Sequence, residues 1–130
     1  MLKKISMRSL TVGALLLAVS FTFSCTKKVT LGKDEVIYKG TATEQEAQKL
    51  GAALKDIHYF ADRGVSVILT KDSEGTAIAF VVQDGVWDKP DAVQAFTEIG
   101  RTVAPAVGGL PIKLRLANTS SETKKEIPLS

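Results

Sequence analysis

The sequence predicts an α+β domain with the element order β-α-β-β-α-β. Apolar residues alternate with polar ones in several short runs, which is typical of strands, and two longer segments repeat apolar residues at helical spacing. The pattern Gly-x-x-Thr-x-x-Glu-Ala of residues 40–47 also recurs as Gly-x-x-Asp-x-x-Asp-Ala in residues 85–92. Two such split β-α-β units form a ferredoxin-like fold, a four-stranded antiparallel sheet with two helices on one face.

The first unit contains a strand, a capped helix and a second strand. A β-prone run at 36–40 precedes Thr43 and Glu46, which have the spacing of a capping box. Apolar residues then recur at steps of three and four, at Ala47, Leu50, Leu54, Ile57 and Ala61. This stripe predicts one helix packed on the sheet, and the alternation at 65–71 predicts the next strand.

The second unit follows a turn at residues 72–75. Residues 76–83 are apolar on both faces, as expected for a central strand. Asp88 and Pro90 predict the start of the second helix, and Pro105 with Gly108 and Gly109 predicts its end. Residues 112–116 alternate again, which predicts the fourth strand, and the polar residues after 118 either extend it to Ile127 or fray.

The N-terminus has the layout of a signal peptide. Lys3, Lys4 and Arg8 precede an apolar run at residues 13–19, which is shorter than the roughly 20 residues that span a bilayer. We therefore expect residues 1–24 to be removed during export. An uncleaved membrane helix is the alternative, because no charge falls between Ser9 and Thr26.

The segment Thr22-Phe23-Ser24-Cys25 resembles the lipobox of bacterial lipoproteins, although Thr22 stands where that family usually has Leu and Phe23 is bulkier than usual. The resemblance implies that Cys25 carries fatty-acyl chains such as palmitate and anchors the chain in a lipid bilayer. An unpaired thiol in an oxidising compartment also favours acylation. Thr26 after the Cys implies the outer membrane of the cell envelope, with the domain in the periplasm or at the cell surface. Ordinary secretion after cleavage at Ser20 is the alternative.

The predicted organisation is a signal peptide at 1–24, a lipidated Cys and tether at 25–34, a ferredoxin-like domain at 35–127 and a tail at 128–130. The stretch 38–51 is similar to a recurrent small domain of uncharacterised membrane-anchored bacterial proteins, a likeness that implies no activity. From Cys25 onward the chain has 14 basic and 14 acidic residues, without a basic patch interleaved with aromatics. We therefore expect no nucleic-acid partner.

The sequence contains no recognisable set of catalytic residues. We therefore expect a protein that is not an enzyme and that binds neither a metal nor a cofactor. His58 is the only histidine and lies at the flank of the first helical stripe, where a boundary role is favoured over that of a base. Without a second His or a nearby Cys it cannot form a usual zinc site. Asp84, Asp88 and Asp91 lack the spacing of a calcium loop and are explained by turns and helix capping. Trp87 and the pair Tyr59-Phe60 either close the ends of the core or form an aromatic contact patch.

The function expected from these observations is a non-catalytic binding module, with a structural envelope component as the alternative. In a ferredoxin-like fold one sheet face has no helices on it. Period-two alternation places on that face a set of residues with an apolar centre and two cations: Ile37, Ile68, Ala79, Val81, Lys113 and Arg115. We expect this face to bind a protein partner or a second copy, unless the tail folds back over it.

Overall fold

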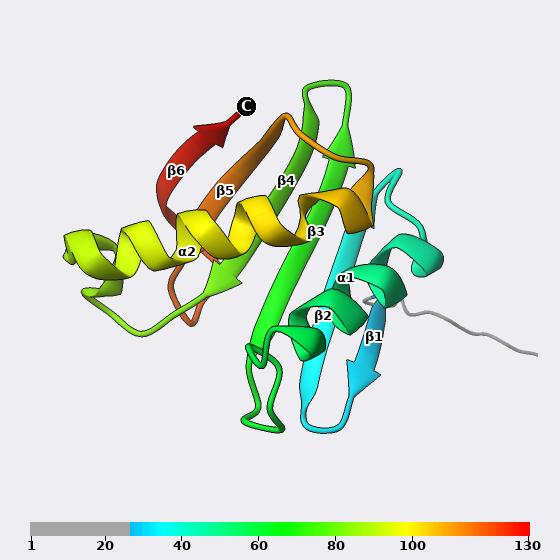
Figure 1. The fold of residues 1–130 in the computed structure, drawn as a ribbon, viewed down its shortest axis with the longest axis horizontal. Coiled ribbons are helices and arrows are strands. Elements are labelled where there is room, and N and C mark those ends of the chain that lie inside the picture. The colour runs from blue at the N-terminus through cyan, green and yellow to red at the C-terminus, as the bar shows by residue number, and fades with distance from the viewer. Residues whose placement is uncertain (1–26) are drawn as a thin grey trace, which may run out of the picture.

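Residues 27–130 are described by a computed structural model, in which a six-stranded mixed sheet carries two α-helices (Figure 1). The expected α+β class is confirmed. The strands and helices are β1 (Lys28–Leu31), β2 (Asp34–Gly40), α1 (Glu44–Asp56), β3 (Ser66–Asp72), β4 (Gly75–Val81), α2 (Pro90–Val103), β5 (Ile112–Ala117) and β6 (Thr123–Leu129). Two short 3₁₀ helices, η2 (Val86–Asp88) and η3 (Ala104–Val107), flank α2.

The predicted ferredoxin-like topology is wrong. The strands lie in sequence order from β1 to β6, and the strands on either side of each helix are direct neighbours. Thus β2 pairs parallel with β3, and β4 pairs parallel with β5, whereas a split unit would place another strand between them. The other three pairings are antiparallel. The sheet is therefore mixed, with six strands in place of four antiparallel ones.

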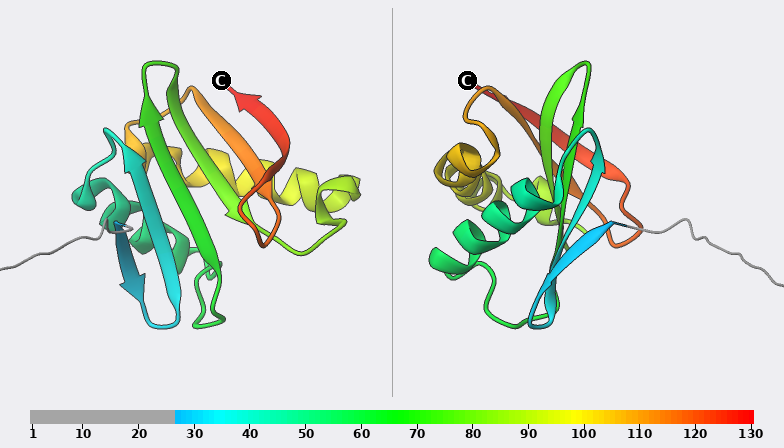
Figure 2. Two further views of the ribbon diagram at one scale, coloured as in Figure 1. Left: turned by 180° about the vertical axis from the view of Figure 1, so that it is seen from behind. Right: turned by 90° about the vertical axis from the view of Figure 1, so that its right-hand side faces the viewer.

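The two helical crossovers have opposite hands. Both step in the same direction across the sheet, but β3 and β4 are antiparallel, so the second parallel pair runs against the first. Both helices lie on the same face, as the edge-on view of Figure 2 shows. In Figure 1 the crossover through α1 is the left-handed one. Left-handed crossovers are rare in proteins, which is why two right-handed units were the natural expectation.

The two terminal strands lie where the sequence suggested a tether and a tail. β1 occupies residues 28–31 and pairs with β2 along its whole length. β6 continues to Leu129, a fully buried residue that packs in the main core. Both segments are thus part of the folded domain. The predicted signal peptide and Cys25 lie outside the described residues.

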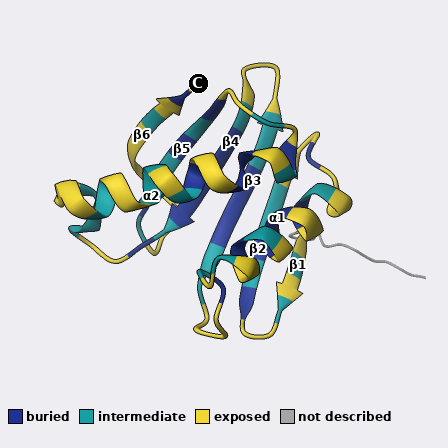
Figure 3. Cartoon of the chain, viewed as in Figure 1, coloured by how far each residue is buried: buried dark blue, intermediate teal, exposed yellow. Residues whose placement is uncertain are grey.

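The core lies between the helices and the sheet (Figure 3). Every second strand residue points into it, and α1 contributes Ala47, Leu50 and Leu54, as its stripe predicted. The capping box of Thr43 and Glu46 is present in both directions. The second helix starts later than expected, because Asp88 belongs to η2 and the N-cap of α2 is Lys89, with no side-chain capping bond.

Candidate functional site

The helix-free face of the sheet brings together four of the six predicted contact residues in one row across neighbouring strands. Ile37 lies opposite Ile68, Ile68 opposite Ala79, and Ala79 opposite Arg115. Because directly paired residues point to the same side of a sheet, these four side chains share one face, away from the helices. We call the six predicted residues on this side the open face.

The other two open-face residues lie in adjacent rows. Lys113 is opposite Ala77, and Val81 is opposite Ala117. Ile68 and Ala79 are buried at 7% exposure each, whereas the other four members are half-buried. The open face therefore contains an apolar strip, formed by Ile37, Ile68, Ala79 and Val81, whose centre is largely covered by neighbouring side chains. The large apolar side chain that stands exposed in the described part of the chain, Leu110 at 42%, lies elsewhere.

Ion pairs line both sides of this strip. The Arg115 Nε donates to Glu126 at 2.7 Å, and the Lys113 ammonium lies 3.5 Å from the carboxylate of Glu74. On the other side Lys28 lies 3.4 Å from Glu35. These acidic partners were not predicted, because period-two alternation does not determine the register between strands. In a four-stranded ferredoxin-like sheet the strand with both cations would lie at an edge, whereas β5 lies inside the observed sheet and β6 covers its edge.

The tail does not cover the open face. Residues 123–129 extend the sheet sideways as β6, paired with β5 from Ile112–Leu129 to Ala117–Thr123. Figure 2 shows no described element on the side of the sheet opposite the helices. The residues after Asn118 neither lengthen the fourth predicted strand nor fray, the two outcomes expected for them, because the chain turns back and forms a separate antiparallel strand.

A buried carboxylate that the sequence did not single out joins two loops at one end of the sheet. Asp34 is 1% exposed and accepts backbone N–H bonds from Asp62, Arg63 and Val65 at 2.8–3.1 Å. Burial alone would raise its pKa, but the backbone donors outweigh burial and lower the pKa. The carboxylate is thus held charged and fully engaged, which suits a structural bond better than proton transfer.

A further ion pair ties α1 to the sheet. The Lys71 ammonium donates to Glu46, the residue that also closes the capping box. The hydrogen bond from Lys71 is the main cause of a lowered Glu46 pKa. Both side chains are about one quarter exposed. This pair fixes the start of the helix on β3.

The histidine and the aromatic residues considered in the sequence analysis lie in surroundings that explain them structurally. His58 is exposed, with a positive φ of 65°, at the end of α1. Tyr59 packs edge-on against Phe80 and Phe96, and burial raises its pKa to about 12. Phe60 is buried in the core. These aromatic residues close the core, and the half-buried Trp87 also packs against the core while lining a groove.

Asp84, Asp88 and Asp91 are exposed, and no group of three or more His, Cys, Asp or Glu suited to a metal ion occurs within residues 27–130. In the same range no helix has the length and apolar character needed to cross a bilayer. No protein-family model, curated protein or solved structure matches the chain.

Proposed function

We propose that this chain is a non-catalytic binding module of the bacterial cell envelope, anchored to a lipid bilayer through an acylated Cys25, and that the open face is its protein-contact surface. The observation that carries the proposal is the row Ile37, Ile68, Ala79 and Arg115, which spans four adjacent strands on the side of the sheet that no described helix covers.

The composition of the open face supports this role. Its centre is apolar, and its rim carries positive and negative side chains that form ion pairs with one another. An apolar centre with a polar rim is the usual composition of a transient protein interface. Because the rim charges are already paired, a partner can cover the apolar strip without leaving an unpaired charge behind.

The start of β1 constrains how an anchored domain is held. Lys28 begins β1 only three positions after Cys25, and an extended chain spans about 3.5 Å per residue. An acyl anchor at Cys25 therefore holds the β1 edge within about 10 Å of the lipidated residue. The β5–β6 side, with Lys113 and Arg115, is then directed away from the point of attachment.

The anchor is tested by mass spectrometry of the mature protein purified from its own membranes. We expect an N-terminal peptide that starts at Cys25 and carries the mass of fatty-acyl chains. A peptide that starts at Phe21 with a free Cys25 thiol, or one that retains Met1, contradicts the anchor and leaves the contact surface as a separate question.

The contact surface is tested by placing a photo-reactive amino acid at Val81 and, as a control, at Ala52, an exposed position on α1. In intact cells we expect a cross-linked product from Val81 and none from Ala52. A product of twice the chain's mass identifies a second copy, and any other discrete mass identifies a different protein. Equal cross-linking from both positions, or none from Val81, argues against the open face.

A further inference from the structure

The first half of α2 extends beyond the edge of the sheet. Figures 1 and 2 show its N-terminal turns passing β6 without a strand beneath them. A groove of about 520 Å³ lies there, between the inner side of the helix and the edge strand. This volume falls in the range of small-molecule sites, roughly 300–1,000 Å³. Its lining residues are Trp87, Asp88, Pro90, Val93, Gln94, Thr97 and Lys125.

The edge beside the groove is unsuited to an added peptide strand. Pro128 has no N–H to offer, the β5–β6 pairing is irregular next to Ala117, and Lys124 and Lys125 are exposed. Proline, irregular pairing and lysine are the devices by which natural edge strands avoid pairing with other chains. The occupant of the groove is therefore better sought among small molecules.

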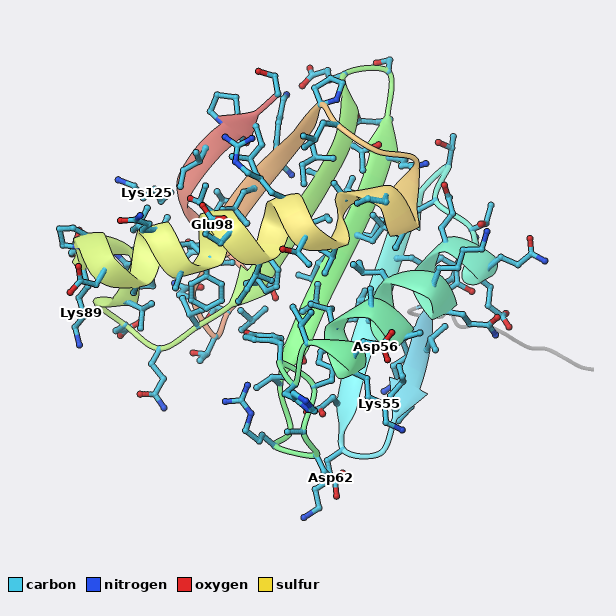
Figure 4. All side chains as sticks on the ribbon, viewed as in Figure 1. Lys55, Asp56, Asp62, Lys89, Glu98 and Lys125 are labelled. Atoms are coloured by element: carbon cyan, nitrogen blue, oxygen red, sulfur yellow. The ribbon has the colours of Figure 1, made fainter. Side chains whose placement is uncertain are left out.

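The lining combines an apolar surface with both hydrogen-bond donors and hydrogen-bond acceptors. Trp87, Pro90 and Val93 form the apolar part. Gln94 supplies an amide and Lys125 an ammonium, while Asp88 supplies a carboxylate. The Thr97 hydroxyl donates to the carbonyl of Val93 at 2.8 Å, so its oxygen remains an acceptor. Figure 4 shows Lys125 beside α2 at this end of the molecule.

These groups match one ligand chemistry better than others. A purely aliphatic ligand would leave the polar lining unpaired. The carboxylate of Asp88 offsets the ammonium of Lys125, so the lining has no net charge that would favour a charged ligand over a neutral one. A sugar ring has an apolar C–H face and hydroxyl edges that both donate and accept. We propose that the groove binds a neutral saccharide, with its ring against Trp87 and its hydroxyls bonded to Asp88, Gln94 and Lys125. This site is separate from the open face and from the anchor.

Trp87 is the only tryptophan in the sequence, so its fluorescence reports directly on the groove. The full chain, in a detergent without a sugar headgroup, is titrated with neutral trisaccharides of glucose, galactose and N-acetylglucosamine. The open-chain polyol sorbitol is the ligand control, because it has hydroxyls but no rigid ring face. We expect saturable fluorescence changes with at least one trisaccharide and none with sorbitol, together with shifts of the Trp87 indole N–H in NMR spectra.

Matched variants locate the binding. Gln94→Ala removes one hydrogen-bonding group from the groove, and Gln48→Ala removes an exposed glutamine from α1. We expect Gln94→Ala to weaken saccharide binding about three- to tenfold, the value of one hydrogen bond, and Gln48→Ala to leave it unchanged. Equal effects of the two variants, an equal response to sorbitol, or no shift of the indole N–H with any of the trisaccharides would overturn the proposal.

Discussion

At the residue scale, one glycine and one ion pair hold the crossover of α1 in place. Gly40 ends β2 with a φ of 67°, and a Cβ there would collide with the carbonyl oxygen of Lys71 on β3. One residue further, the Thr41 N–H donates to the same carbonyl at 2.9 Å. Lys71 also holds Glu46 through its side chain. The chain thus leaves the sheet and enters the helix around a single residue of the neighbouring strand.

Replacing Gly40 separates steric from conformational effects. Gly64 also has a positive φ, 76°, but a Cβ there would meet nothing within 4 Å. Gly64→Ala should therefore cost about 1 kcal/mol of unfolding free energy, the conformational part alone. Gly40→Ala should cost clearly more, because the Lys71 carbonyl must move as well. Urea unfolding of both variants measures the difference, and equal losses would contradict this account of Gly40.

The ion pair predicts an acid-sensitive part of the stability. Lys71 lowers the Glu46 pKa in the folded state, so the pair stabilises the protein fully above the unfolded glutamate pKa of about 4.3. That contribution is lost as the pH falls through the lower folded pKa. We expect the stability gap between wild type and Glu46→Gln to be largest near neutral pH and to shrink in acid.

The urea unfolding midpoints of wild type and Glu46→Gln, measured from neutral to acid pH, give this stability gap at each pH. Glu44→Gln, which removes an exposed charge from the same helical turn, controls for the general loss of a negative charge. A gap that stays constant down to acid pH would show that Lys71 does not stabilise the Glu46 carboxylate.

At the element scale, the sequence predicts both helices and the four inner strands, but neither the two edge strands nor which strands pair. Both helices were expected from their apolar stripes, and the capping box of Thr43 and Glu46 marked the start of α1 within one residue. Period-two alternation also placed the open-face residues correctly on one side. It carries no information about which strand lies beside which, so the direct pairing of β2 with β3 was not predictable from it.

The terminal strands escaped prediction for a related reason. β1 and β6 lie at the edges of the sheet, and edge strands are polar along much of their length. The segment after Asn118 therefore looked like a tail. The signal that identifies β6 as folded is the pair Ile127 and Leu129, which face the core from alternate positions.

Substitution of Leu129 tests whether β6 is an integral strand. Its side chain is 2% exposed and packs in the core, so Leu129→Ala should lower the unfolding free energy by about 2–5 kcal/mol. Pro128→Ala, at an exposed neighbouring position, should change it by less than about 0.5 kcal/mol. Chemical denaturation measures both variants. Small and equal effects would mean that the end of β6 is detached from the core.

At the scale of the whole molecule, the two faces of the sheet differ in what covers them. One face is buried under α1 and α2 and supplies the core (Figure 3). The other is closed only by side chains and by ion pairs such as Arg115 with Glu126. Sequence reasoning found the members of the open face, but their burial and their acidic partners depend on the strand register. The proposed anchor at Cys25 and the proposed contact surface on the open face together make the arrangement expected of a displayed binding module.

The central claim, that the open face is covered by a protein partner in the cell, is tested most directly by cysteine labelling. Two variants, Val81→Cys and Ala52→Cys, are prepared. For each, the rate of maleimide labelling at the introduced cysteine is compared between intact membranes and the purified full chain. Ala52 is exposed on α1 and should react equally in both. We predict that the cysteine at position 81 reacts at least several-fold more slowly in membranes than in purified protein. Equal rates at position 81 in the two preparations would contradict the claim.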